Sequence, residues 1–259
     1  SNFPDRLRKL SGMPKKLYYI GNLPDPKKPA AAVVGARMCS PYGRCQAFKY
    51  ARTMASYGVQ IISGMARGID AEGHKGALDT DTPTFAVLGS GVDVCYPNSN
   101  RWLYQRILEK GGGIISELPP GSPPVNWAFP ARNRIISGLA EVVVIAEAKK
   151  KSGSLITAEH ALEQGKDIYV FPGRTTDALS YGCNALIQQG AGIILSVEEF
   201  LKQLPYNATQ SLQMGKNKKQ CLAKEESLVY SCLSMEPKNI EKIAEETGLG
   251  ISATAGILL

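Results

Sequence analysis

The sequence lacks long apolar segments, closely paired cysteines and all but two histidines. Its longest hydrophobic runs are as short as a β-strand, whereas a membrane-spanning helix needs about 18 apolar residues, so no membrane partner is expected. No charged segment followed by an apolar one opens the chain, so no secretory leader is expected either. The six cysteines form no Cys-x-x-Cys pair, which gives no zinc pattern and favours reduced thiols in the cytoplasm.

Two common nucleotide-binding signatures are also missing. Gly89-Ser-Gly91 does not continue into Gly-x-Gly-x-x-Gly, because Val94 stands where the third glycine belongs. No glycine-rich loop ends in the lysine of a P-loop. The sequence therefore predicts neither a dinucleotide site nor a P-loop, and no cofactor or metal is expected.

Acidic residues are too few to balance the basic ones, so the formal net charge is +7. After Leu204 the chain has six Lys or Arg and six Asp or Glu residues, which leaves 24 basic and 17 acidic residues in positions 1–204. A basic domain of this kind attracts polyanions such as nucleic acid. An ordinary solvated basic surface explains the charge equally well.

Short apolar runs alternate with helix-length segments between residues 30 and 196, which predicts an α/β fold with a doubly wound, mostly parallel sheet. The N-terminal residues 1–30, rich in Pro and Lys, are expected to form a strap on this domain, which ends near residue 204. The expected strands are 30–34, 60–63, 84–88, 113–116, 141–146, 168–171 and 192–196, and the expected helices are 41–57, one that ends near 78, 99–109, 152–164 and 184–189.

The C-terminal part changes character. Residues 205–222 are polar and predict a linker. Residues 223–259 then predict three helices, at 225–233, 237–247 and 251–259, with a Gly248-Leu-Gly250 turn between the last two. The third helix has no Lys or Arg, which favours a protein-interaction or vestigial role over DNA reading. We expect a truncated, winged-helix-like α-helical module here.

Glycine and serine gather in the loops that follow the expected strands. Because the carboxyl ends of parallel strands meet at one edge of a sheet, these loops are expected to lie together and to let backbone approach a ligand. The loops are 35–40, 63–68, 89–91, 152–154 and 172–173.

The segment Phe129-Pro-Ala-Arg-Asn-Arg134 precedes the strand at 141–146 and has few uses in a core. Pro130 is expected to stop a helix from running straight through it. Arg132 and Arg134 offer planar donors for phosphate oxygens, and Phe129 offers a face on which a base stacks. The sequence thus predicts one wall of a single-stranded nucleic-acid site.

Further phosphate donors are expected beside this wall. Arg37 follows the first strand and precedes the helix that opens at Pro41, whose amino end favours anions, with Ser63 and Gly64 next door. Lysines 149–151 precede a Ser/Gly turn at another helix start. A surface salt bridge for Arg37 and a solvated lysine face remain the alternatives.

Catalytic groups are harder to find. His74 and His160 lie inside expected helices, where a structural or surface role is favoured over that of a base. Four carboxylates are left as acid–base candidates, and no spacing joins a nucleophile to a base, so an enzyme is not the expectation. The four are Asp70, Asp93, Glu117 and Glu159.

The motifs, taken together and in this order, resemble the DprA/Smf family of DNA-processing proteins over residues 3–204. They are Val33-Val-Gly-Ala-Arg37, Ser63-Gly-Met-Ala-Arg-Gly-Ile-Asp70, Ala86-Val-Leu-Gly-Ser-Gly-Val-Asp93 with Tyr96-Pro97, Ser116-Glu117, Phe129-Pro-Ala-Arg-Asn-Arg-Ile-Ile136, Ser152-Gly-Ser-Leu-Ile-Thr-Ala158 and Phe171-Pro-Gly173. The resemblance implies an extended Rossmann-like domain that binds single-stranded DNA, forms a homodimer, protects incoming DNA and loads RecA onto it during natural transformation.

Carried onto this chain, the resemblance implies a DNA-binding site on the loops and on the 129–134 segment. The expected nucleic-acid-binding residues are Arg37, Ser63, Gly64, Arg67, Gly89, Gly91, Phe129, Arg132, Asn133, Arg134, Lys149, Ser152, Gly153, Ser154 and Thr157.

Two rival hypotheses stay open. The turn from Ser152 to Thr157, followed by Glu159, partly resembles the glycine-rich turn and catalytic Glu of LOG-like phosphoribohydrolases. Those enzymes bind a nucleotide at the same strand ends. Release of a free base from a nucleoside monophosphate would support that enzyme. A pure scaffold for partner proteins would show no affinity for nucleic acid.

Overall fold

The computed structural model describes residues 3–8, 10–204, 229 and 238–258 of the 259-residue chain. Two compact units are present, Ser1–Gly215 and Lys216–Leu259, and each is described by itself. Within the described residues, no helix is both long enough and apolar enough to cross a lipid bilayer.

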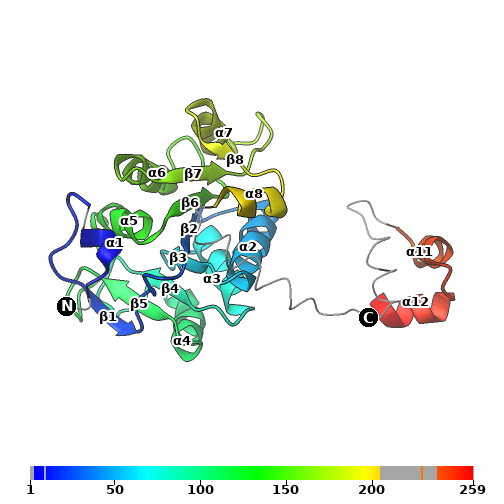
Figure 1. Ribbon diagram of the computed structural model, residues 1–259, viewed down its shortest axis with the longest axis horizontal. Helices are drawn as coiled ribbons and strands as arrows, with labels where there is room; N and C mark the ends of the chain where they lie inside the picture. The colour runs from blue at the N-terminus through cyan, green and yellow to red at the C-terminus, as the bar shows by residue number, and fades with distance from the viewer. Residues whose placement is uncertain (1–2, 9, 205–228, 230–237, 259) are drawn as a thin grey trace. The chain divides into compact units, whose positions relative to one another are not determined.

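The first unit is built on an eight-stranded sheet with the order β1-β5-β4-β3-β2-β6-β7-β8 (Figure 1). Six of the seven neighbouring pairs are parallel, and only β1 runs antiparallel, against β5. After β2 the chain builds outward to β5 and then returns to place β6 on the other side of β2. The gap between the ends of β2 and β6 is therefore the topological switch point, where α/β sheets bind ligands. The strands are β1 (Tyr18–Gly21), β2 (Ala30–Val34), β3 (Gln60–Ser63), β4 (Thr84–Val87), β5 (Gly113–Ser116), β6 (Val142–Ile145), β7 (Asp167–Val170) and β8 (Gly192–Ile193).

Helices cover both faces of the sheet (Figure 1). Successive side chains of β2 point to opposite faces, so Ala31 and Val33 join the core under α2, α3 and α8, while Ala32 and Val34 join the core under α5, α6 and α7. The helices are α1 (Asp5–Arg8), α2 (Pro41–Ser56), α3 (Ile69–Leu78), α4 (Arg101–Glu109), α5 (Ala128–Leu139), α6 (Gly153–Glu163), α7 (Tyr181–Gln188) and α8 (Val197–Gln203).

The α/β class and the mostly parallel, doubly wound sheet are confirmed. The N-terminal strap differs from expectation, since Tyr18–Gly21 forms a true edge strand, β1, on β5. The short helix α8, capped by Ser196, was also not foreseen. It packs Phe200 and Leu201 into the α2 side of the core.

The expectation for Pro130 was wrong. The segment 129–134 does not interrupt a helix but lies inside α5, with Pro130 as its third residue. Backbone N–H groups in a first helical turn have no acceptor within the helix, so the missing N–H of proline costs nothing there. The consequence is that Phe129, Arg132, Asn133 and Arg134 point in directions set by a helix.

The second unit contains α11 (Ile240–Thr247) and α12 (Ile251–Leu258), which match the second and third helices expected there. Asn239 caps α11 by accepting a hydrogen bond from the Lys242 N–H, and Gly248 ends it in the left-handed conformation with φ +69°. The linker at 205–222 and the expected helix at 225–233 lie outside the described residues, apart from Val229.

Candidate nucleic-acid interface

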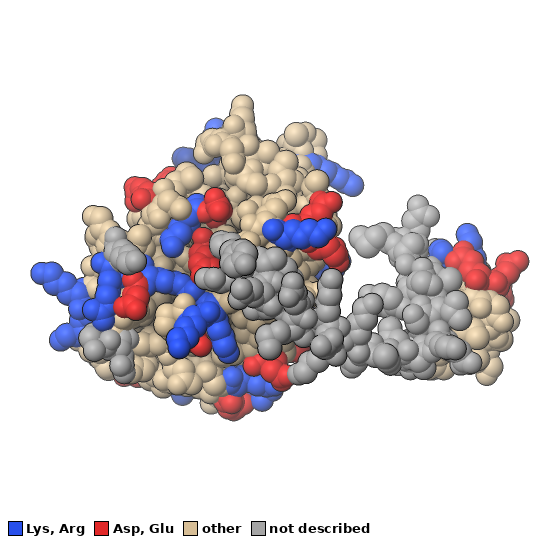
Figure 2. Space-filling view, in the orientation of Figure 1, with Lys and Arg blue, Asp and Glu red and all other residues tan. Residues whose placement is uncertain are grey.

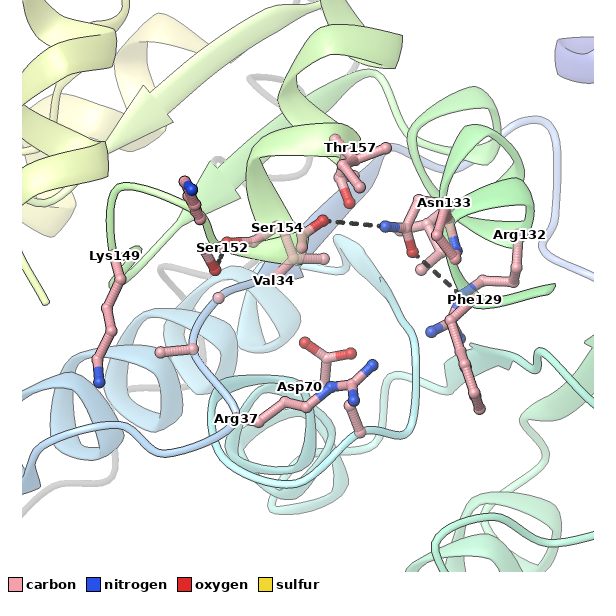
Figure 3. Close-up of a pocket in the computed structure, with 18 of the residues that line it drawn as sticks. Val34, Arg37, Asp70, Phe129, Arg132, Asn133, Lys149, Ser152, Ser154 and Thr157 are labelled. Carbon is pink, nitrogen blue, oxygen red and sulfur yellow. Dashed lines mark hydrogen bonds between the residues drawn. The ribbon is translucent and has the colours of Figure 1, made fainter. Parts of the chain in front are cut away.

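A pocket of about 480 Å³ opens at the switch point between β2 and β6 (Figure 3). The turn after β2 forms one side, the 149–157 segment with the start of α6 forms a second, and α5 forms a third. Asp70 of α3 and Arg132 of α5 lie at its base. The pocket brings together nine of the expected binding residues, namely Arg37, Phe129, Arg132, Asn133, Lys149, Ser152, Gly153, Ser154 and Thr157.

The first side is an exposed turn held against α3. Gly35 has no room for a side chain, since a Cβ there would lie 2.7 Å from Ile69 Cγ1. The Ile69 N–H also donates to the Ala36 carbonyl at 3.2 Å, which fixes the turn on the amino end of α3. As a result, Arg37 reaches across the pocket, with its Cζ 5.5 Å from the centre of the Phe129 ring.

The second side is suited to an anion. Asn133 Nδ2 donates to the Gly153 carbonyl at 3.1 Å, and the Ser152 and Ser154 hydroxyls lie 2.8 Å apart. A Cβ on Gly153 would meet no atom within 4 Å, so a ligand has open access to the backbone there. The amino end of α6 adds the positive end of its dipole, and the exposed Lys149 adds a full charge.

The base of the pocket is a buried charged cluster. Arg132, only 6 % exposed, donates from Nη1 to the carbonyl oxygens of Gly64, at 2.8 Å, and Val87. Burial lowers the pKa of Arg132 to about 10, while Asp70 acts in the opposite direction, so the guanidinium stays charged at neutral pH. Burial likewise raises the pKa of Asp70, and the nearby Arg132 opposes that shift. Arg132 thus holds the strand ends together and shapes the base of the pocket.

The Phe129 ring is supported from several directions. Gly89 lies beneath it, because a Cβ there would stand 2.7 Å from Phe129 Cδ1. The Tyr96 ring lies with its centre 5.4 Å from that of Phe129, at an interplanar angle of 36°. Gly89 therefore serves the ring of Phe129 and does not line the pocket itself.

The expectation that the amino end of α2 receives a phosphate was wrong. Glu147, 5 % exposed, already lies there and accepts hydrogen bonds from the Ser40 backbone N–H at 2.8 Å and the Ser40 hydroxyl at 2.5 Å. Gly43 leaves the space, since a Cβ on it would collide with the Glu147 carboxyl group. The chain supplies its own anion to this helix. The sequence signal was a carboxylate two residues after the apolar strand β6.

Six expected binding residues do not line the pocket. Ser63 is buried and donates its hydroxyl to the Val33 carbonyl at 2.6 Å, and Gly64 makes room for the Arg132 guanidinium. Arg134 instead donates from Nη2 to both carboxylate oxygens of Glu117, at 2.7 and 2.9 Å. The others are Arg67, Gly89 and Gly91.

Most of the acid–base candidates do not line the pocket. Of the four carboxylates, only Asp70 lines it, while Glu159 is exposed on α6. His74 is fully buried, where its Nδ1 lies 2.8 Å from the Thr84 hydroxyl, and burial lowers its pKa to about 3. In the described part of the chain, no group of three His, Cys, Asp or Glu residues is placed to hold a metal ion. Glu159 thus does not take the place that the phosphoribohydrolase hypothesis requires.

Basic side chains are not restricted to the pocket. Figure 2 shows a group of Lys and Arg residues over the region of α1 and β1, with few acidic residues among them. Net charge alone therefore does not locate a candidate site, whereas the geometry of the pocket does.

Comparison with known proteins supports a nucleic-acid role. Residues 1–205 match the family described as DNA recombination-mediator protein A. The DNA processing protein DprA of Streptococcus pneumoniae is 43 % identical over 204 residues, which are 79 % of this chain and 72 % of that protein. Protein Smf of Escherichia coli is 41 % identical over 204 residues, so this chain spans only 54 % of its length.

Solved structures agree with these matches. The crystal structure of S. pneumoniae DprA has a TM-score of 0.75 at 42 % identity and covers 80 % of this chain and 72 % of that one. A structure of DNA processing protein A from Helicobacter pylori, determined for insight into its single-stranded DNA binding mode, has a TM-score of 0.71 at 31 % identity. It covers 83 % of this chain and 94 % of that one.

Proposed function

Because the chain belongs to the family of DNA recombination-mediator protein A, we propose that it binds single-stranded DNA in the switch-point pocket. The observation that carries the proposal is the meeting of Arg37, Phe129 and the Ser152–Ser154 turn around one open pocket. Single strands are bound by basic grooves that follow the backbone, combined with aromatic rings on which bases stack. Both features are present here: Lys149 and the amino end of α6 lie on one side of the pocket, Phe129 lies on the other, and Arg37 reaches across to the ring.

The backbone phosphates fit the side formed by Lys149 and the amino end of α6. Gly153 offers close approach, and the Ser152 and Ser154 hydroxyls offer further donors. Arg37, in the turn after β2, adds a second positive charge that attracts the phosphates. Asn133 takes a positioning role, since its side-chain amide bonds the Gly153 carbonyl and so holds the turn against α5.

We extend the proposal to the organisation and biology of the protein. Binding is assigned to residues 1–204, with 205–222 as a linker and 223–259 as a separate winged-helix-like module. A family of recombination mediators implies delivery of the strand to a recombinase, which we take to be RecA acting on incoming DNA in the cytoplasm during natural transformation. The four described cysteines, at positions 39, 45, 95 and 183, are free thiols, as suits that compartment. A homodimer is part of the same proposal.

The proposal is tested by titrating the protein with fluorescent oligo-dT at several salt concentrations. We expect tight binding that weakens steeply with salt, and much weaker binding of a duplex of equal length. Equal affinity for the two, or no binding at low salt, would remove the proposed function. RecA filament assembly on oligo-dT coated with a single-strand binding protein then tests delivery, which the protein should accelerate.

A further inference from the structure

Tyr96 lies beside the pocket, in the loop that follows β4, and is 46 % exposed. This loop is held firmly. The Ser90 hydroxyl donates to the Val94 carbonyl at 2.8 Å, and the Tyr104 hydroxyl donates to the Val92 carbonyl at 2.8 Å. The Ser116 hydroxyl adds a bond of 2.6 Å to the Ser90 carbonyl. The backbone just before Tyr96 is therefore held in place, which lowers the entropy cost of using the ring for binding.

Phe129 has less free ring surface than its neighbour. It is only partly exposed and is contacted by Gly89, Tyr96 and the Arg37 guanidinium. Tyr96 therefore offers a base that approaches the aromatic side of the pocket more accessible ring surface than Phe129 does. The tilted contact between the two rings stabilises this orientation of Tyr96.

The pocket also has a direction. Lys149 and Phe129 lie on opposite sides of it (Figure 3), with the Ser152–Ser154 turn on the lysine side. A strand whose phosphates follow the lysine side turns its bases toward the rings. Tyr96 extends the ring side beyond the pocket, where a neighbouring base of the same strand would lie.

We propose that Tyr96 is a base-stacking residue of this site, with Phe129 as the ring that supports it. The inference rests on the proposed single-strand function and adds a residue and a role to it. A stacked base contributes affinity without regard to sequence and without a phosphate contact, so the contribution of Tyr96 should not depend on salt.

The test compares oligo-dT with an abasic oligomer of equal length, which keeps the phosphates and lacks the bases. Tyr96→Ala should weaken oligo-dT binding on the order of tenfold and leave binding of the abasic oligomer unchanged. Tyr96→Phe keeps the ring and should bind as the unaltered protein does. Trp102→Ala is the matched control, because Trp102 is an aromatic residue of similar exposure, 49 %, that lies on α4 outside the pocket.

A second measurement uses the unaltered protein and so does not depend on the folding of a variant. An oligomer carrying 5-iododeoxyuridine should, on irradiation, form a crosslink that peptide mass spectrometry maps to Tyr96. A crosslink that maps only elsewhere would overturn the proposal.

The outcomes separate this inference from the function on which it rests. If the unaltered protein binds neither oligomer, the single-strand site itself fails. If it binds oligo-dT and Tyr96→Ala binds equally well, the role of Tyr96 fails while the site stands. An equal loss for both oligomers would mean that Tyr96 positions phosphate contacts, and would also overturn stacking.

Discussion

The two sides of the pocket use their cations in different ways. On the β2 and β6 side, Arg37 and Lys149 are exposed at the pocket. On α5, Arg132 is buried against carbonyl oxygens, and Arg134 is paired with Glu117. The α5 arginines therefore stabilise the protein around the site, while the loop cations are placed to meet a ligand. At both positions of α5 the guanidinium group is thus already engaged by groups of the protein itself.

Glycine positions follow the same division. Gly64 and Gly89 lack side chains because Arg132 and Phe129 fill the space, whereas Gly153 faces open space. A glycine next to a pocket thus makes room either for another side chain of the protein or for open space in front of the backbone. Only a glycine of the second kind marks a surface that a ligand can reach.

The largest effect is expected for Arg132→Ala. It leaves the Asp70 carboxyl and two carbonyl oxygens without their buried partner, which typically costs about 3–5 kcal/mol of unfolding free energy. Urea unfolding followed by circular dichroism measures the change. Arg134→Ala is the control, and loss of its partly buried pair with Glu117 should cost less, about 1–2 kcal/mol. Similar losses in the two variants would contradict the division between the arginines.

Phe129→Ala should weaken single-strand binding by about 1–3 kcal/mol, since the ring side of the pocket loses its support. The salt dependence of binding should stay as in the unaltered protein, because no phosphate contact is removed. Fluorescence anisotropy with oligo-dT at four salt concentrations gives both values. A flatter salt dependence would show instead that Phe129 serves to position Arg37.

The buried side chain of His74 should also make the stability of the protein depend on pH. The pKa of His74 is lowered from 6.5 to about 3, so the folded protein leaves it neutral while the unfolded chain binds a proton. The contribution of His74 to the free energy of unfolding is therefore fully present above about pH 6.5. It is lost, by about 1.4 kcal/mol per pH unit, as the pH falls toward the folded-state pKa of about 3. Unfolding of the unaltered protein and of His74→Gln at pH 7 and 5.5 checks this. An equal pH dependence in both would be the contrary result.

Most of the fold was predictable because its signals are local. Buried parallel strands are short apolar runs in the sequence. Likewise, Pro41 directly after the capping Ser40 indicates the start of α2. The edge strand β1 was missed because Tyr18–Gly21 is mainly exposed and lacks an apolar run. Pro130 misled because its cost depends on its place in a helix, and the preceding Pro-rich loop hides where α5 begins.

The site was predictable in its residue types and less so in their roles. Nine of fifteen expected residues meet at the pocket. Whether the other six reach the pocket depends on the direction of their side chains and backbone, which the sequence alone does not give. Arg134 and Arg132 are two positions apart on α5 and so face different ways. The role of Glu147, and the one that we propose for Tyr96, were not predicted because each depends on a partner distant in sequence, Ser40 and Phe129 respectively.

The most direct test of the central claim is the salt dependence of oligo-dT binding for Arg37→Ala beside Arg134→Ala. Removing one phosphate contact should lower the slope of log affinity against log salt by about one unit and weaken binding roughly tenfold at 0.1 M salt. We predict this change for Arg37→Ala and almost none for Arg134→Ala. Equal changes in the two variants, or a change in Arg134→Ala alone, would contradict the account that the loop cations, and not the arginines of α5, bind the strand.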